Sequence, residues 1–284
     1  MERIKQAIEK VKARQPGKAS SPAQSRPGSQ GAMPTPRSSQ AHGELGVISY
    51  ENTRTVRLRA EHLERNRIVA VNKNDPKGMP FDLLRTYVLQ KMEENGWRTL
   101  AITSPTPESG KTVVAINLAI SIAHQTNRTA MLVDFDLRRP KVGAYLGITM
   151  EKSMNDLIDE TAELPDVLVN PDIPRLVVLP ARKPVKKSSE TLSSRKIENL
   201  IKDLRERYES RIVIFDLPPL LVADDASVLL PQIDCVLMVV ANGMSTKREI
   251  DDSIRLIPPA KLIGTILNKA EIEPVSYYYG SPAD

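Results

Sequence analysis

The sequence has one cysteine, few aromatic residues and no long apolar segment, and each shortage excludes a class of protein. Because Cys235 is alone, no internal disulfide can form, so we expect a reducing cytoplasm. Aromatic residues make up 4% of the chain, which argues weakly against an extended platform for single-stranded nucleic acid. No apolar run reaches the roughly 18 residues that span a bilayer, and the first residues lack the apolar core of a secretion signal.

The formal net charge of +5 is concentrated near the N-terminus, so it does not indicate a nucleic-acid partner. In residues 1–14, apolar side chains recur at helical spacing among Lys and Arg. This pattern predicts a basic amphipathic helix that folds against a partner, a membrane or its own domain, with a frayed terminus as the alternative. Residues 15–46 are rich in Pro, Ser, Gly and Gln, which predicts a disordered linker.

After a pre-domain segment at residues 47–79, strand and helix patterns alternate through residues 80–270. A helix is expected over residues 80–95, ended by Gly96. Apolar runs predict strands at residues 99–104, 129–136, 175–181, 211–218, 235–241 and 261–268. Helical periodicity fills most of the intervals, as in residues 113–125 and 194–208. The chain is therefore predicted to be an α/β protein with a doubly wound, mostly parallel sheet, whose ligands bind at the carboxyl ends of the strands.

The first of these strand ends carries a phosphate-loop pattern with one departure. Residues 104–112, "SPTPESGKT", connect a strand to a helix, but Pro105 stands where the first glycine of G-x-x-x-x-G-K-[ST] is expected. Gly110, Lys111 and Thr112 are retained. Backbone N–H groups at the helix start would face phosphate oxygens, Lys111 would add a positive charge, and Thr112 would be placed to bind Mg²⁺.

Two further strand ends carry carboxylates. In "MLVDFDLRRP", Asp134 and Asp136 flank one residue and are expected on the same face of a strand, where they would repel each other unless a cation lies between them. In "RIVIFDLPP", Asp216 ends a strand that two prolines stop. A phosphate loop beside carboxylates for a metal indicates nucleotide phosphoryl chemistry.

These three motifs together resemble the Walker A, Walker A′ and Walker B motifs of bacterial tyrosine kinases, the CpsD/CapB-like cytoplasmic kinases of capsule and exopolysaccharide synthesis. The segments "LVVLPA", "DLPPLLVADDA" and "GTILNKA" and the final "YYYG" are similar too, so that the resemblance covers residues 79–280. The N-terminal helix and linker are similar to the branch that accompanies exosortase-type exopolysaccharide loci.

The resemblance implies a P-loop NTPase fold of the MinD/ParA-like type, ATP and Mg²⁺ as cofactors, and autophosphorylation on tyrosine. It places nucleotide contacts at Ser109, Gly110, Lys111, Thr112, Val113 and Asn268, although Asn268 could equally be an ordinary strand-end asparagine. It implies that Thr112, Asp134 and Asp216 hold the metal. Asp134 and Asp136, with Lys111, are the implied catalytic residues. Tyr277, Tyr278 and Tyr279, in a tail at residues 271–284, are the implied phosphate acceptors; the alternative is an aromatic tail that packs on the core or forms a sticky surface.

The resemblance also implies a membrane polysaccharide co-polymerase (chain-length determinant) as partner, contact with further copies of the chain, and a peripheral position at the inner face of the cell membrane. The family's subunit-contact motif Glu-x-x-Arg-x-x-Arg is reduced to Met79, Asp82 and Arg85, so self-assembly is expected to be weak. Glu108 in the phosphate loop and Arg182 after "LPA" are further departures.

Two alternatives stay open. One is a nucleotide-binding regulatory subunit of the polysaccharide assembly complex that transfers no phosphate. The other is a localisation ATPase of the ParA/MinD class, but those proteins carry a signature lysine where this sequence has Thr106.

Overall fold

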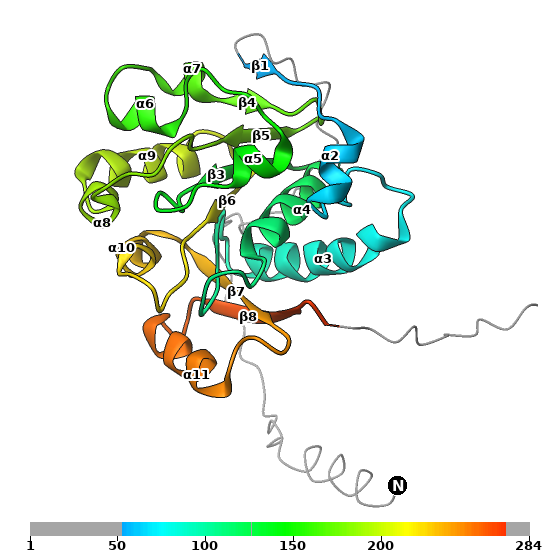
Figure 1. Cartoon of the computed structure of the whole chain (residues 1–284), viewed down its shortest axis with the longest axis vertical. Helices are drawn as coiled ribbons and strands as arrows, with labels where there is room; N and C mark the ends of the chain where they lie inside the picture. The colour runs from blue at the N-terminus through cyan, green and yellow to red at the C-terminus, as the bar shows by residue number, and fades with distance from the viewer. Residues whose placement is uncertain (1–52, 126, 271–284) are drawn as a thin grey trace, which may run out of the picture. The chain divides into compact units, whose positions relative to one another are not determined.

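A mostly parallel sheet of eight strands forms the centre of the described chain (Figure 1), which in this computed structural model comprises residues 53–125 and 127–270. In spatial order the strands are β1 (Arg54–Thr55), β4 (Val169–Asn170), β5 (Leu176–Leu179), β3 (Thr129–Asp134), β6 (Arg211–Asp216), β2 (Thr99–Thr103), β7 (Cys235–Ala241) and β8 (Leu262–Asn268). Every pairing is parallel except that of β4 with β5. The predicted fold class and the six predicted strands are confirmed, whereas β1 and β4, two residues each, were missed.

Helices cover both faces of the sheet, as a doubly wound fold requires (Figure 1). They are α2 (Ala60–Arg65), α3 (Met79–Glu94), α4 (Lys111–Ala123), α5 (Val142–Leu146), α6 (Met154–Ile158), α7 (Leu164–Val167), α8 (Ser188–Leu192), α9 (Arg195–Glu206), α10 (Asp225–Leu229) and α11 (Lys247–Leu256), with short 3₁₀ turns η1 (Pro76–Gly78) and η2 (Leu230–Gln232). Among the described helices, none is long and apolar enough to span a bilayer.

The strands are apolar along their whole length because both faces of the sheet are buried. In β2, Leu100 and Ile102 belong to the core beneath α3 and α4, whereas Ala101 belongs to the core beneath α9 and α10. This arrangement explains why the strands show continuous apolar runs instead of alternation.

Residues 54–70 belong to the segment that we predicted to precede the P-loop domain, at residues 47–79. They contribute to the same sheet and core as that domain. Strand β1 pairs with β4, and Leu63 and Ile68 are buried. Asn117 of α4 accepts hydrogen bonds from the backbone N–H groups of Val69 (2.8 Å) and Ala70 (2.9 Å). The segments predicted at residues 1–14, 15–46 and 271–284 lie outside the described residues.

Candidate nucleotide-binding site

The predicted phosphate loop connects β2 to the start of α4, at the carboxyl edge of the sheet. Gly110 caps α4 with a φ of 88°, a left-handed conformation that glycine adopts without strain. Pro105 is part of this loop, and its carbonyl accepts a hydrogen bond from the Leu221 N–H at 3.1 Å. The Ser109 hydroxyl donates to the Thr106 carbonyl at 3.0 Å and tightens the turn.

Lys111 lies between two carboxylates. Its Nζ is 2.7 Å from Asp136 Oδ2 and 3.4 Å from Asp216 Oδ1. Burial disfavours the ammonium, but the charges of Asp216 and Asp136 outweigh burial and raise the pKa of Lys111 above its ordinary value. The side chain therefore stays charged inside the protein.

Asp216 joins the helix start to the strands. Its Oδ2 accepts a hydrogen bond from Thr112 Oγ1 at 2.7 Å. Strand β6 lies between β2 and β3, so Asp216 stands level with Ile102 on one side and with Asp134 on the other. Burial raises the pKa of Asp216, although the charge of Lys111 and the hydrogen bond from Thr112 oppose this shift.

Asp134 is fully buried, and within the described chain only one of its two carboxylate oxygens accepts hydrogen bonds. Its Oδ2 accepts from the backbone N–H groups of Lys141 (3.1 Å) and Val142 (3.0 Å). Its Oδ1 is buried and accepts no hydrogen bond from the residues that the structure describes. Burial and the nearby charge of Asp216 raise the pKa of Asp134 well above its ordinary value.

Asp136 does not share a strand face with Asp134, as the sequence had suggested, because β3 ends at Asp134. Asp136 instead belongs to the following loop, where its Oδ1 accepts the backbone N–H of Arg139 at 3.0 Å. A cation does lie among the carboxylates, and within the chain that cation is Lys111.

Asn268, at the end of β8, contacts the phosphate loop itself. Its side-chain amide donates to the Ser109 carbonyl at 2.8 Å. A Cβ atom added to Gly110 would collide with the same amide. Asn268 therefore holds the loop in place, and its predicted contact with adenine stays a prediction.

Sequence reasoning missed one ion pair beside the site. Arg138 Nε donates to Asp225 Oδ1 at 2.9 Å, and Asp225 is fully buried. The signal was present, because Asp225 belongs to "DLPPLLVADDA", a segment that the resemblance had already marked. This pair fixes the loop after Asp136 against α10.

The structure brings most of the predicted site together. The residues that converge at the carboxyl ends of β2, β3, β6 and β8 are Ser109, Gly110, Lys111, Thr112, Asp134, Asp136, Asp216 and Asn268. Val113 follows in the first turn of α4. Tyr277, Tyr278 and Tyr279 lie outside the described residues.

The side chains around Lys111 supply the kind of donor atoms that bind a magnesium ion. Among the described residues no cluster of three or more His, Cys, Asp or Glu could hold a metal by itself. The candidate set instead combines the hydroxyl of Thr112 with the carboxylates of Asp134 and Asp216, and oxygen donors are what Mg²⁺ prefers. The unsatisfied Oδ1 of Asp134 fits a carboxylate that binds a cation.

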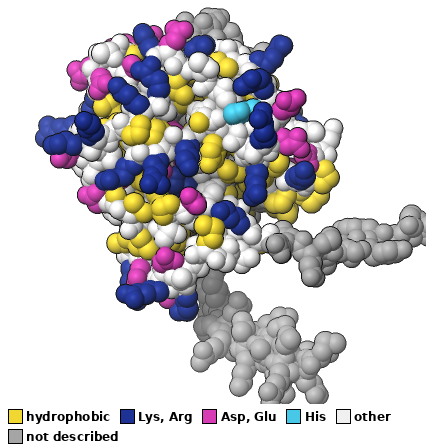
Figure 2. All heavy atoms as spheres, in the orientation of Figure 1, with side chains coloured by type: hydrophobic (Ala, Val, Ile, Leu, Met, Phe, Trp, Pro, Cys, Tyr) yellow, Lys and Arg dark blue, Asp and Glu magenta, His cyan; other side chains and the backbone are white. Residues whose placement is uncertain are grey.

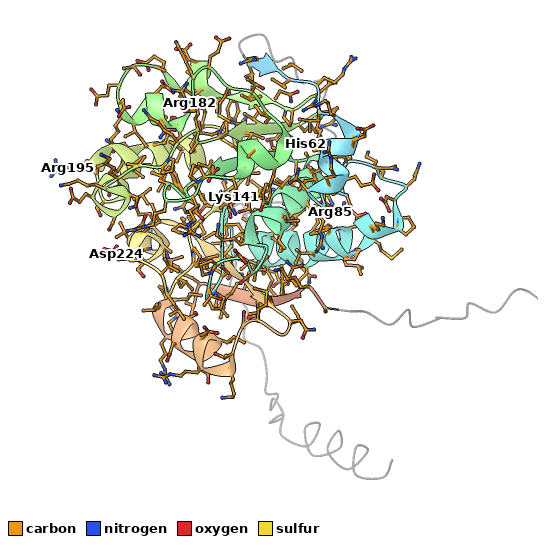
Figure 3. All side chains as sticks on the ribbon, viewed as in Figure 1. His62, Arg85, Lys141, Arg182, Arg195 and Asp224 are labelled. Carbon is orange, nitrogen blue, oxygen red and sulfur yellow. The ribbon has the colours of Figure 1, made fainter. Side chains whose placement is uncertain are left out.

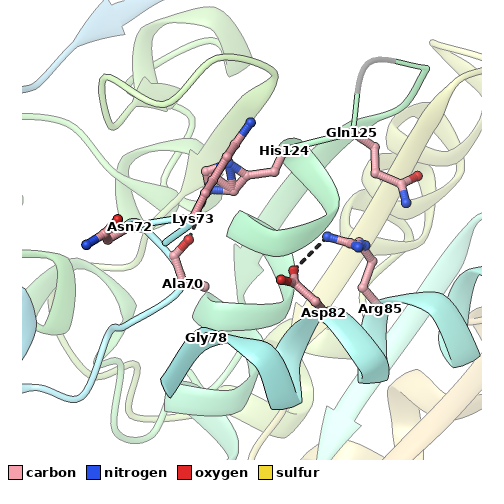
Figure 4. Close-up of a pocket in the computed structure, with 8 residues that line it drawn as sticks. All are labelled: Ala70, Asn72, Lys73, Gly78, Asp82, Arg85, His124 and Gln125. Atoms are coloured by element: carbon pink, nitrogen blue, oxygen red, sulfur yellow. Dashed lines mark hydrogen bonds and ion pairs between the residues drawn. The ribbon is translucent and has the colours of Figure 1, made fainter. Parts of the chain in front are cut away.

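A separate pocket of about 220 Å³ lies between η1, α3 and the end of α4 (Figure 4). It includes Asp82 and Arg85 of the altered subunit-contact motif, which pair with each other at 2.7 Å. Ser121 of α4 donates to Asp82 at 2.6 Å. Both motif residues therefore interact within the chain, whereas Met79 is 62% exposed.

Comparison with known proteins shows the family. A family model described as "AAA domain" matches residues 98–251, which is more than half of the chain. The chain belongs to this AAA domain family.

Several relatives of this AAA domain are named tyrosine-protein kinases. This chain is 29% identical over 181 residues to the tyrosine-protein kinase ptk of Acinetobacter johnsonii. The match covers 63% of this chain but only 24% of ptk. This chain is also 29% identical over 183 residues to the tyrosine-protein kinase CpsD of Streptococcus pneumoniae. That match covers 63% of this chain and 79% of CpsD.

A solved structure agrees with these relatives. The kinase domain of the Escherichia coli tyrosine kinase ETK superimposes with a TM-score of 0.65 at 25% identity, covering 83% of this chain and 95% of that domain. The resemblance to bacterial tyrosine kinases is thereby confirmed, while the assignment to the exosortase branch stays a prediction.

Proposed function

We propose that this AAA domain protein is an ATP-dependent protein-tyrosine kinase that phosphorylates itself and regulates exopolysaccharide or capsule synthesis. One observation carries the proposal: Lys111 and Thr112, at the start of α4, contact Asp136 in the loop after β3 and Asp216 at the end of the neighbouring strand β6. This arrangement joins a phosphate-binding helix start to buried carboxylates. The kinase names of its relatives support the proposal.

The loop and the start of α4 would bind ATP. Backbone N–H groups between Ser109 and Val113 would face the phosphates, where the helix dipole also favours negative charge. Lys111 would exchange its contact with Asp136 for the β- and γ-phosphates. Asn268 is the proposed adenine contact in addition to its hydrogen bond with Ser109.

Thr112, Asp134 and Asp216 would hold Mg²⁺. When bound, the ion would neutralise charge on the β- and γ-phosphates. Asp134 and Asp136 would support this arrangement and accept the proton of the attacking tyrosine, because a neutral hydroxyl is a poor nucleophile. The tyrosine oxygen would form a bond to the γ-phosphorus as the bond to the β-phosphate oxygen breaks, leaving phosphotyrosine and ADP.

Tyr277, Tyr278 and Tyr279 are the proposed acceptors, phosphorylated by a second copy of the chain. Residues 1–14 would tether the kinase at the inner face of the cell membrane, first through a polysaccharide co-polymerase and second through lipid. Each lysine near an anionic surface contributes about 1 kcal/mol, so lipid alone would attach the chain weakly. Removing residues 1–14 should release the protein from membranes in cells and leave its ATP affinity unchanged.

A second candidate is a regulatory subunit that binds nucleotide without transferring phosphate. Glu108 favours it, because this residue places a negative charge in the phosphate loop. A ParA/MinD-type localisation ATPase is not favoured, because Thr106 stands at the position of the signature lysine.

The test is mass spectrometry of phosphotyrosine on the purified chain with ATP and Mg²⁺, alone and with the cytoplasmic segment of a candidate co-polymerase. We expect phosphate on Tyr277 to Tyr279 in the wild type and none in Lys111→Met. Mixing Lys111→Met with an active chain whose three tail tyrosines are Phe should label the inactive copy. Nucleotide binding without phosphotyrosine under every condition would establish the regulatory subunit instead.

A further inference from the structure

Two loops at the carboxyl edge of the sheet concentrate positive charge beside the candidate site. Residues 137–150, which run from the loop after β3 through α5, and residues 180–189, which run from the end of β5 to the start of α8, together contain seven Lys or Arg and no Asp or Glu. The seven are Arg138, Arg139, Lys141, Arg182, Lys183, Lys186 and Lys187. Lys and Arg gather over this face in Figure 2, and Figure 3 labels Lys141 and Arg182 there. We call residues 138–141 and 182–187 the basic rim.

The basic rim is held in a fixed conformation. Its two loops are joined by a hydrogen bond from the Val185 N–H to the Leu137 carbonyl at 2.8 Å. The buried side chain of Asn155 accepts from the N–H groups of Arg182 (2.8 Å) and Lys183 (3.1 Å) and donates to the Lys183 carbonyl (2.9 Å). A ligand that binds the rim would therefore not have to order these loops first.

Part of this charge is not neutralised within the described chain. Arg138, Arg182 and Lys187 form ion pairs with Asp225, Asp156 and Glu190. The side chains of Arg139, Lys183 and Lys186 are exposed, and none of them forms an ion pair with the residues that the structure describes. Because the Arg139 N–H donates to Asp136, the rim begins at the candidate site itself.

The end of the chain has the complementary charge. Residues 271–284 contain Glu271, Glu273 and Asp284 but no Lys or Arg, and these carboxylates flank the three tyrosines. We propose that the basic rim is the docking surface for this acidic segment of a second copy of the chain, where it selects the segment and positions its tyrosines for transfer. The inference rests on the proposed kinase function.

Geometry favours a second copy over the same chain. Strands β5 and β8 are five positions apart in the sheet, which at about 4.8 Å per strand is about 24 Å. Glu273 is five residues beyond Asn268, where β8 ends, so it reaches at most about 18 Å from that point. Glu273 of the same chain would therefore reach residues 182–187 only with its backbone and both side chains extended, whereas that of a second copy is not so limited.

The experiment measures docking without requiring phosphate transfer. A fluorescent peptide of residues 271–284 is titrated with the full chain, and binding is followed by anisotropy. The rim variant is Lys183→Glu with Lys186→Glu, and the matched control is Lys202→Glu, an exposed lysine of α9 outside both loops. We expect the rim variant to bind the peptide about fivefold to tenfold more weakly and the control to bind normally. Nucleotide affinity should be the same in all three proteins.

Charge reversal on the peptide makes the test specific. A peptide with Glu271→Lys and Glu273→Lys should bind the rim variant better than the unaltered peptide does, and added salt should weaken only the attractive combinations. Equal binding of both peptides to wild type and rim variant would overturn the proposal. So would a rim variant that binds the peptide normally but loses binding to vesicles with anionic lipid, because the rim would then be a membrane surface. Charge-dependent docking without phosphotyrosine, both alone and with the co-polymerase segment, would support the rim and refute the kinase.

Discussion

Lys111 Nζ lies 2.7 Å from Asp136 Oδ2, and this contact joins the first turn of α4 to the loop that follows β3. Both side chains are nearly excluded from water, with 10% and 8% of their surface exposed. The same ammonium is 3.4 Å from Asp216, so one lysine neutralises a carboxylate of the loop after β3 and another at the end of β6. Replacing this lysine affects both the proposed phosphate contact and the charge balance of the site.

For Lys111→Met we expect Mg-ATP binding to be lost and the protein to become less stable. The phosphate contact disappears, and Asp136 and Asp216 lose a buried partner, a change that typically costs about 3 to 5 kcal/mol. Calorimetric titration with ATP and urea unfolding measure the two effects separately. Lys202→Met, an exposed site on α9, is the control. ATP affinity equal to that of the wild type in folded Lys111→Met protein would show that Lys111 does not bind phosphate.

Asp134→Asn should slow phosphate transfer by about a hundredfold or more, because a positioned carboxylate contributes about that much to catalysis. ATP affinity should change far less, since the backbone contacts of the loop are untouched. Single-turnover labelling and ATP titration separate the rate from the affinity. Asp224→Asn removes an exposed carboxylate next to Asp225 and should change neither quantity. Equal rates of phosphate transfer in the two variants would show that Asp134 does not take part in catalysis.

Gly110→Ala should weaken ATP binding by about tenfold or more, because the added Cβ collides with Asn268 and displaces the loop that donates to phosphate. Gly243→Ala is a matched control, since Gly243 has a φ of 70° and nothing within 4 Å of an added Cβ. Both variants carry the left-handed strain of about 1 to 2 kcal/mol. Urea unfolding and ATP titration are the measurements, and equal loss of affinity in both variants would contradict the packing role of Asn268.

His124 should make the protein less stable as the solution becomes acidic. Burial is the main cause that lowers the pKa of His124. The charges of Lys73 and Arg85 lower this pKa further, whereas the charge of Asp82 raises it. The unfolded chain therefore binds a proton at His124 more readily than the folded chain does. The stability that neutral His124 contributes is complete above about pH 6.5 and is lost as the pH falls below that value. Urea unfolding of wild type and His124→Gln between pH 7.5 and 5 tests this. The wild type should lose more stability than the variant over that range.

Cys235 should be unreactive in the folded protein. Burial raises the pKa of the Cys235 thiol to about 12, so at pH 8 only about one thiol in ten thousand is ionised. A chromogenic disulfide reagent should label the native chain slowly and label one thiol per chain at once in urea. Rapid labelling under native conditions would mean that β7 opens far more often than its burial indicates.

Local pattern was enough to predict the fold class and to find charged residues at three strand ends. Parallel strands buried on both faces must be apolar throughout, so β2, β3, β5, β6, β7 and β8 are visible as runs of Val, Ile and Leu. Lys111, Asp134 and Asp216 are visible because a charged residue is unexpected beside such runs. The two-residue strands β1 and β4 have no such pattern and arise from pairing alone.

Which of these residues meet depends on contacts between distant parts of the chain. The order β3, β6, β2 places Asp134 level with Asp216 and beside the start of α4, and no local spacing specifies that order. Asn268 reaches Ser109 across 159 positions of sequence, and Val185 joins its loop to Leu137 only because β5 packs beside β3. Such neighbours are chosen by burial of both faces of the whole sheet, a property of the assembled core that no single segment contains.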